Sequence, residues 1–370
     1  MTNESKSAMP DVTRPQLFIN RELSQLKFNE RVLEQARDES APLLERLKFL
    51  CISCGNLDEF FEIRVGGLKQ HIEYSTGYKT ADDIPPTQLL IEIKHQASRL
   101  VEEQYKVFNE IIIPVLAEQN IELIPRERWT PQQRAWIHKY FTDQVEPVLS
   151  PLGIDPGHPF PRILNKSLNF IVEVGGTDAF GRDGHLAIVQ APRSLPRIIA
   201  LPDEDTVSSK YVFLSSIIHA YVHELFEGLK IHGCYQFRVT RNSDLFVEDE
   251  IDDLMLALEG ELASRRYGDA VRLETATNTP DHLTQYLLQQ FHLTETDLYR
   301  VNGPVNLNRL SNIYDLLERP DLKFAPFTAK LPQPITPESN LFKVIAKEDV
   351  LMHHPYQSFT PVISFIHQAA

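Results

Sequence analysis

Helical spacing of apolar residues along the first third of the chain is the strongest constraint on its fold. Over residues 18–118 they recur at i, i+3 and i+4, the pattern of amphipathic helices. Asn20 is placed to cap the first of these helices, and the longest is predicted to end near Pro114. The pattern predicts an all-α domain over residues 16–119, preceded by a disordered tail over residues 1–15.

After residue 120 the sequence takes on a mixed α and β character. Every second residue from Leu168 to Val174 is apolar, as in a strand, and Thr130-Pro131-x-Gln133 has the form of a helix start. Further strands are predicted at 186–190, 197–201, 237–240 and 271–274, and helices at 213–226, 249–266 and 281–291. Because no regular βαβ repeat joins them, these elements predict an α+β domain over residues 120–325.

A proline-rich crossing begins at Pro320 and leads to a final short helix over residues 362–368. This helix ends the chain with no cap and no following element. Such an end is unusual for a complete domain.

The net charge of the 370-residue chain, −14, limits the kinds of partner it can bind. It argues against broad binding of nucleic acid or of an anionic membrane, so a polyanion would have to meet a local, sheltered basic lining. The chain has no run of about 18 apolar residues, and residues 1–14 lack the apolar core of a signal peptide. With three cysteines, which fit a reducing compartment, these features predict a cytoplasmic protein without a membrane span.

The stretch from Gly55 to Lys69, G-N-L-D-E-F-F-E-I-R-V-G-G-L-K, combines a polar start with an apolar helical face. Asn56, followed three residues later by Glu59, has the form of a capping box with Asn56 at the N-cap. A well-capped core helix explains the whole stretch. An asparagine at such a helix start is also placed to contact a ligand, and the residues alone leave both interpretations open.

Neither a P-loop sequence nor a G-x-G-x-x-G sequence is present, so arginines or lysines would have to bind any phosphate. Two arginine clusters qualify: Arg238 with Arg241, and Arg265 with Arg266 and Arg272. Arg238 and Arg241 lie three apart on a predicted strand, so they should point to opposite faces, and at most one would face a channel. Arg265 and Arg266 also suit the last turn of a helix with an acidic start, which needs no ligand.

Histidine and cysteine pairs are weaker candidates. His219 and His223 stand four apart on a predicted helix beside Glu224, a spacing that can chelate a metal, but no third ligand is apparent. Cys51-x-x-Cys54 lies in a helical pattern without a second cysteine pair to complete a zinc site. No metal site is therefore predicted in this chain.

A series of ten short strings runs along nearly the whole chain. They are F-I-N-R-E-L-S-Q-L-K-F-N-E-R-V-L (18–33), N-L-D-E-F-F-E-I-R-V-G-G-L-K (56–69), H-P-F-P (158–161), N-K-S-L-N-F (165–170), L-P-R-I-I-A-L-P (195–202), F-R-V-T-R-N-S-D-L (237–245), R-R-Y-G-D-A-V-R-L-E (265–274), Y-R-V-N-G-P-V-N-L (299–307), R-P-D-L-K-F-A-P-F-T (319–328) and D-V-L-M-H-H-P-Y-Q-S-F (349–359). In this order they resemble the polyphosphate kinase family, the type that works through a phosphohistidine.

The resemblance implies an α+β multidomain protein. Residues 16–119 would form the helical N-terminal domain, on the side of the ATP adenine, and residues 120–325 an α+β head domain that helps to build a homodimer or higher homo-oligomer. Residues 326–370 would be the truncated start of the first of two α/β C-terminal domains with a phospholipase-D-like fold.

The resemblance also implies a reaction, the reversible transfer of the ATP γ-phosphate to a histidine and then to a growing inorganic polyphosphate chain, with Mg²⁺. In that family the asparagine that matches Asn56 contacts the adenine of ATP. The phosphorylated histidine and the ligands of magnesium and phosphate belong to the C-terminal half. His353 and His354, which could accept a phosphoryl group in principle, lie upstream of the family's catalytic histidine, so no catalytic residue is expected in this chain.

Three hypotheses follow from the resemblance. In the first, the chain is the N-terminal portion of a polyphosphate kinase; it binds ATP only weakly by itself and acts only when the other half is supplied. In the second, it is a catalytically inactive, truncated module that binds polyphosphate or nucleotide, or assembles with an intact kinase. In the third, it is an interaction protein that binds no nucleotide. The arginines Arg238, Arg241, Arg265, Arg266 and Arg272 are candidate contacts for polyphosphate.

Overall fold

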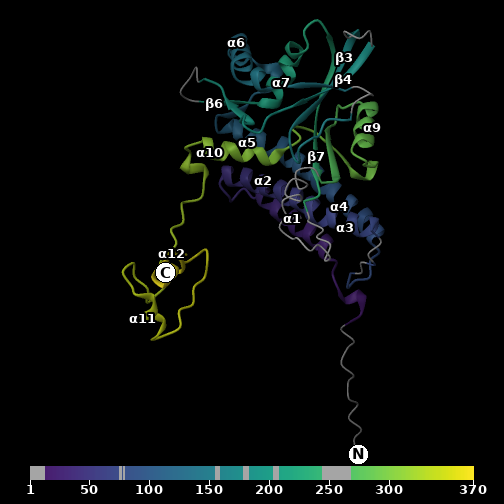
Figure 1. Cartoon of the computed structure of the whole chain (residues 1–370). Helices are drawn as coiled ribbons and strands as arrows, with labels where there is room; N and C mark the ends of the chain where they lie inside the picture. Colours follow the sequence, from purple (N-terminus) through teal and green to yellow (C-terminus); the bar gives the residue numbers. More distant parts are fainter. Residues whose placement is uncertain are drawn as a thin grey trace, which may run out of the picture. The chain divides into compact units, whose positions relative to one another are not determined.

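The computed structural model describes residues 13–74, 77, 80–154, 159–177, 183–202, 208–243 and 268–370 (Figure 1). The chain divides into two compact units, Met1–Leu322 and Lys323–Ala370.

Two long helical segments, each containing a π-helical turn, dominate the beginning of the first unit (Figure 1). The first consists of α2 (Leu43–Glu59), the π-helical turn η2 (Phe60–Val65) and α3 (Gly66–Glu73), and the second of α4 (Pro86–Lys106), the π-helical turn η3 (Val107–Ile112) and α5 (Ile113–Glu118). They pack with α1 (Arg21–Arg37), whose cap Asn20 accepts a hydrogen bond from the Leu23 N–H at 3.0 Å. The predicted helical N-terminal part is confirmed.

Two helix boundaries differ from the prediction. Asn56 lies inside α2 and caps no helix, because the helix runs unbroken from Leu43 to Glu59 and the buried apolar residues before Asn56 (Leu50 and Cys51) are followed by Leu57 and by Phe60 of η2. The second long segment continues past Pro114 to Glu118. The π-helical turn η3 ends two residues before that proline, and its altered hydrogen-bond pattern accommodates the N–H that proline lacks.

Two sheets follow the helical part. The three-stranded sheet has the order β1 (Ile121–Leu123), β6 (Ser209–Phe213), β5 (Ile198–Ala200), with β1 parallel to β6. The six-stranded sheet has the order β2 (Pro151–Ile154), β4 (Asp183–Gln190), β3 (Asn169–Thr177), β7 (Lys230–Arg241), β8 (Ala270–Ala276), β9 (Leu298–Val301). It is antiparallel except for the pair β8 and β9.

Four α-helices accompany the sheets in the described part of the first unit: α6 (Pro131–Tyr140), α7 (Leu214–Tyr221), α9 (Asp281–Gln290) and α10 (Ser311–Leu316). The predicted start of α6 is confirmed, since Thr130 and Gln133 form a capping box with bonds of 3.2 and 3.0 Å. The helix predicted over 249–266 lies outside the described residues. Among the helices that the structure describes, none has the length and apolar content needed to cross a membrane.

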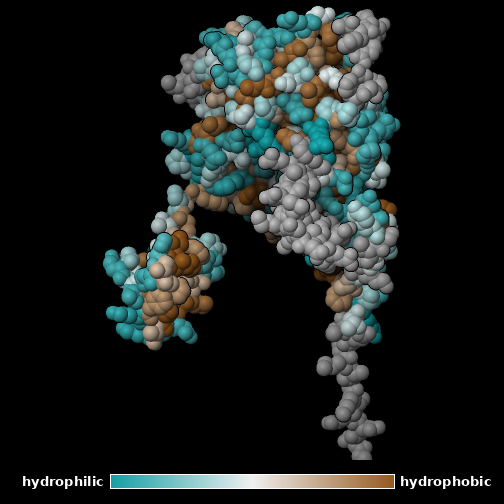
Figure 2. Space-filling model, viewed as in Figure 1, coloured by the Kyte–Doolittle hydropathy of each residue, from teal (hydrophilic) through white to brown (hydrophobic). Residues whose placement is uncertain are grey.

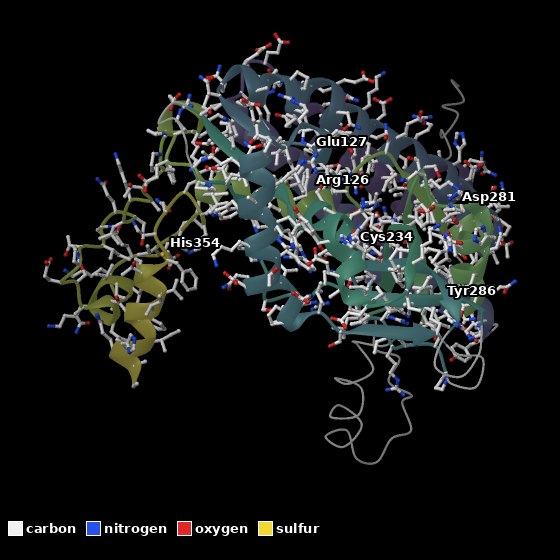
Figure 3. All side chains as sticks on the ribbon, turned by 90° about the horizontal axis from the view of Figure 1, so that it is seen from above. Arg126, Glu127, Cys234, Asp281, Tyr286 and His354 are labelled. Atoms are coloured by element: carbon white, nitrogen blue, oxygen red, sulfur yellow. The ribbon has the colours of Figure 1, made fainter. Side chains whose placement is uncertain are left out.

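The six-stranded sheet is buried on both faces. One face, with Phe170 and Val189, joins the core of the helical part in a single hydrophobic cluster. The other face, with Phe237 and Leu273, packs against Leu287 of α9. The labels of Asp281 and Tyr286 locate α9 in Figure 3. The helical part and the sheets of the first unit therefore share one core.

The second unit contains the helices α11 (Leu341–Ile345) and α12 (Thr360–Ala369). They pack through Phe342 and Phe365, whose ring centroids are 5.0 Å apart. Apolar side chains remain on its surface (Figure 2), and Leu351 is 91% exposed.

Candidate functional site

Asn56 lies on the side of α2 that faces α1. Its Nδ2 donates a hydrogen bond to Asn29 Oδ1 at 3.4 Å, and Asn29 Nδ2 donates to the carbonyl of Ser53 at 2.9 Å. The bond to the Ser53 carbonyl orients the Asn29 amide, so its oxygen is turned toward Asn56. With its nitrogen committed to Asn29, Asn56 offers its oxygen as an acceptor.

The two asparagines line a hollow of about 130 Å³ between α1 and α2. The other lining residues are Gln25, Leu26, Phe28, Glu59 and Phe60. The hollow is smaller than the pockets of roughly 300–1,000 Å³ that enclose whole ligands. Its size suits a single ring system and not a complete nucleotide.

Asp58, two residues beyond Asn56, points away from this hollow into a buried cluster of charges. Arg238 donates from Nη1 and Nη2 to the two Asp58 oxygens at 2.7 and 2.8 Å, and it also pairs with Glu274. Arg272 lies 3.4 Å from Asp58 Oδ1 and donates to Glu274 Oε1 at 2.7 Å. The two arginines, from β7 and β8, are only 3% and 2% exposed.

The charges of this cluster cancel formally, because it contains two guanidinium and two carboxylate groups. Burial disfavours the Arg238 cation, but Asp58 and Glu274 outweigh burial and raise the pKa of Arg238. Burial raises the pKa of Glu274, against the opposite effect of the two arginines. Buried ion pairs of this kind specify geometry more than they add net stability. The cluster therefore fixes how α2 meets β7 and β8.

A second set of contacts joins η2 to the sheet beside this cluster. Glu62 accepts hydrogen bonds from Lys166 Nζ at 2.6 Å and from Asn165. Gly66 lies so close to Asn242 that an added Cβ would come within 2.5 Å of its Oδ1. We call the contact formed by the charge cluster, Glu62 and Gly66 the seam.

The predicted opposite orientation of Arg238 and Arg241 is confirmed. Arg241 lies over the ring of Phe291, 5.7 Å from its centroid, and donates to the carbonyls of Ile163 and Gly268 at 3.0 and 2.8 Å. Arg238 points to the other side of the sheet and meets Arg272 in the seam. The structure thus brings Arg238 and Arg272 together, with carboxylates between them, and separates Arg241 from both.

The remaining two arginines of the predicted set, Arg265 and Arg266, lie outside the described residues.

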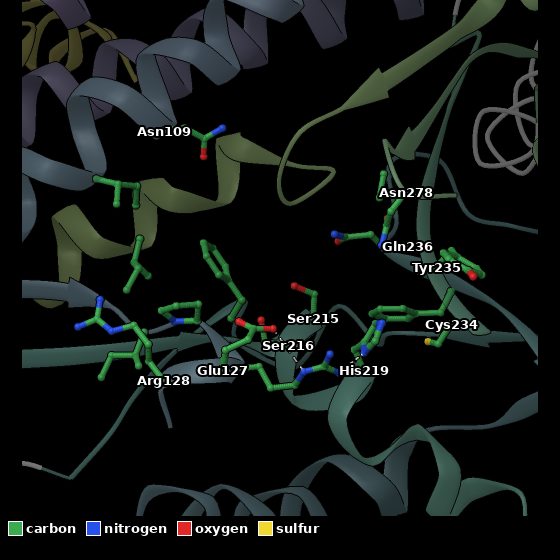
Figure 4. Close-up of a pocket in the computed structure, with 18 of the residues that line it drawn as sticks. Asn109, Glu127, Arg128, Ser215, Ser216, His219, Cys234, Tyr235, Gln236 and Asn278 are labelled. Atoms are coloured by element: carbon green, nitrogen blue, oxygen red, sulfur yellow. Dashed lines mark hydrogen bonds and ion pairs between the residues drawn. The ribbon is translucent and has the colours of Figure 1, made fainter. Parts of the chain in front are cut away.

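The two histidines with helical spacing do not share a helix. His219 lies on α7, whereas His223 follows in the 3₁₀ turn η7 (Val222–Leu225). His219, which is labelled in Figure 4, turns its Nδ1 toward the guanidinium of Arg126, and burial, together with Arg126, lowers the pKa of His219. Within the described ranges, no group of three or more His, Cys, Asp or Glu residues is arranged to hold a metal ion.

The cysteines of the C-x-x-C sequence both lie on α2, as the helical pattern predicts. Burial raises the pKa of Cys51 to about 12 and that of Cys54 well above its ordinary value. Both side chains therefore remain protonated thiols at neutral pH, which is unfavourable for redox chemistry.

In the second unit, His353 and His354 are exposed. Their rings pack against different aromatic residues, Tyr356 at 5.0 Å and Phe359 at 5.1 Å between centroids.

Sequence reasoning missed Asn29, which lies opposite Asn56, and Glu62, which reaches Lys166. All four residues fall within the strings that carry the family resemblance: Asn29 in residues 18–33, Asn56 and Glu62 in residues 56–69, and Lys166 in residues 165–170. Polar residues at buried helical positions, such as Asn29, were the available signal, because a buried amide requires hydrogen-bond partners.

Comparison with known proteins gives a consistent result along the chain. Three family models match in order: the polyphosphate kinase N-terminal domain over residues 18–124, the middle domain over 132–313 and C-terminal domain 1 over 340–370. A polyphosphate kinase of Pseudomonas putida is 53% identical over 365 residues, which cover 98% of this chain and 50% of that protein. One of Pseudomonas aeruginosa PAO1 is 54% identical over 356 residues, which cover 96% and 52%.

The chain spans about half the length of the curated relatives it matches. The crystal structure of polyphosphate kinase from Porphyromonas gingivalis covers 95% of this chain and 49% of that chain, with a TM-score of 0.76 and 24% identity, and it shows a common fold. From the helical part to the second unit, the fold and the family models agree, and the chain belongs to the polyphosphate kinase family.

Proposed function

We propose that this chain is the N-terminal portion of an ATP-polyphosphate phosphotransferase, and that it supplies adenine recognition and assembly. The reaction is the reversible transfer of the ATP γ-phosphate, through a phosphohistidine, to a growing polyphosphate chain. The phosphohistidine and the ligands of Mg²⁺ with ATP belong, in this proposal, to the half of the relatives that the chain does not match. The proposal includes a cytoplasmic location and a homo-oligomer built by the head domain, residues 120–325.

The oriented Asn56 amide in a ring-sized hollow is the observation that carries the proposal. Adenine presents an amino group as donor next to ring nitrogens as acceptors. The Asn56 oxygen is suited to accept from that amino group, and the half-exposed ring of Phe28 is available for stacking. Guanine carries an oxygen at the same ring position, which would face the Asn56 oxygen without a hydrogen bond. The site should therefore prefer ATP over GTP.

Titration of the chain with ATP and with GTP tests the adenine site. We expect weak binding of ATP, weaker binding of GTP, and loss of the difference in Asn56→Ala. Asn29→Ala should reduce the same ratio, because Asn29 positions the Asn56 amide. Asn312→Ala, on α10 and outside the hollow, is the matched control. Equal affinities for the two nucleotides in the unaltered chain would contradict the adenine site, and so would tight, magnesium-dependent ATP binding.

Complementation tests the activity. The chain is mixed with the separately expressed C-terminal half of the Pseudomonas putida relative, and polyphosphate formed from ATP is followed over time. We expect polyphosphate synthesis from the mixture only. Robust synthesis by this chain alone would contradict the proposal that the catalytic groups belong to the C-terminal half. If the mixture is inactive although the chain binds polyphosphate, a binding or assembly module becomes the better description.

A further inference from the structure

Two arginines outside the seam face one hollow with no described carboxylate between them. Arg197 directly precedes β5, and Arg309 lies on the 3₁₀ turn η9 (Leu307–Leu310). With Lys166 they line a cavity of about 30 Å³. Glu62 holds Lys166 at 2.6 Å, but neither arginine has an ion-pair partner in the part of the chain that the structure describes.

The surroundings of Arg197 are unfavourable for an unaccompanied cation. Its Nη2 donates to the carbonyl of Ala191 at 3.2 Å, whereas its Nη1 is buried and has no hydrogen-bond partner among the described residues. Burial, and then the charges of Arg309 and Arg193, lower the pKa of Arg197 to about 10. Buried donors in folded proteins are nearly always paired, so this site lacks an acceptor, and an anion would supply both the acceptor and the counter-charge.

Two buried oxygens in the same hollow also bear on the identity of the occupant. Oε1 of Gln236 and Oδ1 of Asn306 have no partner among the described residues. An occupant must therefore accept from arginine and donate to an amide oxygen. A phosphate group with one protonated oxygen, or a phosphate with a bridging water, does both.

The size and the neighbourhood of the hollow indicate a chain of phosphates. About 30 Å³ has room for roughly two water molecules, which suits a single phosphate group. A larger hollow of about 450 Å³, drawn in Figure 4, adjoins it. Both hollows are lined by Phe213, Ser215 and Gln236. Arg126 and Arg128 line the larger hollow; Glu127, which also lines it, lies 3.9 Å from Arg126, and Glu122 lies 3.4 Å from Arg128. A linear anion can thus occupy the small hollow with one group and continue past Ser215 toward further cations.

We propose that Lys166, Arg197 and Arg309 form a subsite for one phosphate group of a linear polyphosphate, whose next groups lie in the adjoining hollow. This assignment rests on the proposed function for the identity of the polyanion. It provides the sheltered basic lining that a chain of net charge −14 needs to bind a polyanion. Inorganic phosphate has the same chemistry for the small hollow alone, and the experiment separates the two sources.

Calorimetric titration of the 370-residue chain with tripolyphosphate and with inorganic phosphate, at matched ionic strength, tests the subsite. We expect saturable binding of tripolyphosphate and at least roughly tenfold weaker binding of phosphate. Arg197→Gln and Arg309→Gln should each weaken tripolyphosphate binding by about tenfold to a hundredfold, the range for loss of a hydrogen bond to a charged group. Arg99→Gln, which changes the net charge equally on the 56% exposed Arg99 side chain of α4, should leave it unchanged.

Control measurements distinguish loss of the subsite from misfolding and from failure of the adenine site. Arg309 is exposed, so its variant should fold, and circular dichroism of all variants checks this. Absence of saturable binding, or an equal loss in Arg99→Gln, would overturn the subsite; phosphate binding as tight as tripolyphosphate would overturn its continuation into the larger hollow. The ATP-to-GTP ratio, measured on the same arginine variants, should not change. If that ratio is absent while arginine-dependent tripolyphosphate binding persists, the adenine site fails and the subsite stands.

Discussion

The two arginine pairs of the first unit have opposite surroundings. In the seam, Arg238 and Arg272 are enclosed with Asp58 and Glu274, and their charges are neutralised by the chain itself. At the small hollow, Arg197 and Arg309 have no such partners among the described residues. Whether an arginine can bind an external anion therefore depends on whether the fold places carboxylates next to it, and not on whether arginines cluster in the sequence.

Removing Asp58, one of the two carboxylates shared by both seam arginines, should have the largest effect. Asp58→Ala leaves two buried guanidinium groups with one carboxylate, so we expect it to lower the free energy of unfolding by about 3–5 kcal/mol. Urea denaturation followed by circular dichroism measures this. The double variant Asp58→Leu with Arg238→Met should lose less than Asp58→Ala alone, because it removes both charges. A loss below about 1 kcal/mol for Asp58→Ala would show that the cluster is not enclosed as described.

A methyl group added to the seam should have the next largest effect. In Gly66→Ala the new Cβ would meet the buried side chain of Asn242, and we expect a loss of about 1–3 kcal/mol in the same assay. Gly153→Ala is the control, since nothing lies within 4 Å of its added Cβ. If the two variants are equally stable, the seam is less tightly packed than the structure shows.

Neutralising an arginine of the small hollow should raise the free energy of unfolding, whereas the two seam variants lower it. Arg197→Gln removes a cation with no described counter-charge, so we expect an increase in stability of up to about 1 kcal/mol in the absence of polyphosphate. Tripolyphosphate should then raise the melting temperature of the unaltered protein more than that of the variant. A loss of more than about 2 kcal/mol would place Arg197 with the structural arginines of the seam.

The smallest expected effect is a pH dependence at the adjoining hollow. The pKa of His219 is lowered by burial and by Arg126, so between this pKa and 6.5 the unfolded chain binds the proton and the folded chain does not. Stability should therefore fall as the pH decreases through this range, and His219→Gln should reduce that fall. His223→Gln, which removes a 60% exposed imidazole nearby, is the matched control.

Short-range patterns predict the elements well where the deciding interactions are local. The capping box of Thr130 and Gln133 begins α6, and the alternation over 168–174 lies within β3. The capping box expected at Asn56 fails, because a cap requires the helix to begin there and the preceding apolar residues keep α2 intact. A capping sequence is therefore informative only when the residues before it cannot continue the helix.

Long-range partners are the part that the sequence does not reveal. Periodicity is sufficient to predict that Arg238 and Arg241 face opposite sides of a strand, but it contains nothing about Asp58. A polar helix start and the family resemblance both point to Asn56, whereas the orientation of its amide depends on Asn29 of another helix. Arg197 and Arg309 stand alone in the sequence, and only the fold brings them to one cavity.

The seam joins segments that are synthesised at different times. Asp58 and Arg238 are separated by 180 positions. Because ribosomes add about 5–20 residues per second, Arg238 is synthesised roughly 10 to 40 s after Asp58. During that interval the nascent helices expose the surface that β7 and β8 later cover. The first part of the chain therefore leaves the ribosome with an unfinished core, and a chaperone that shields α2 at this stage would protect the protein when it is most prone to aggregate.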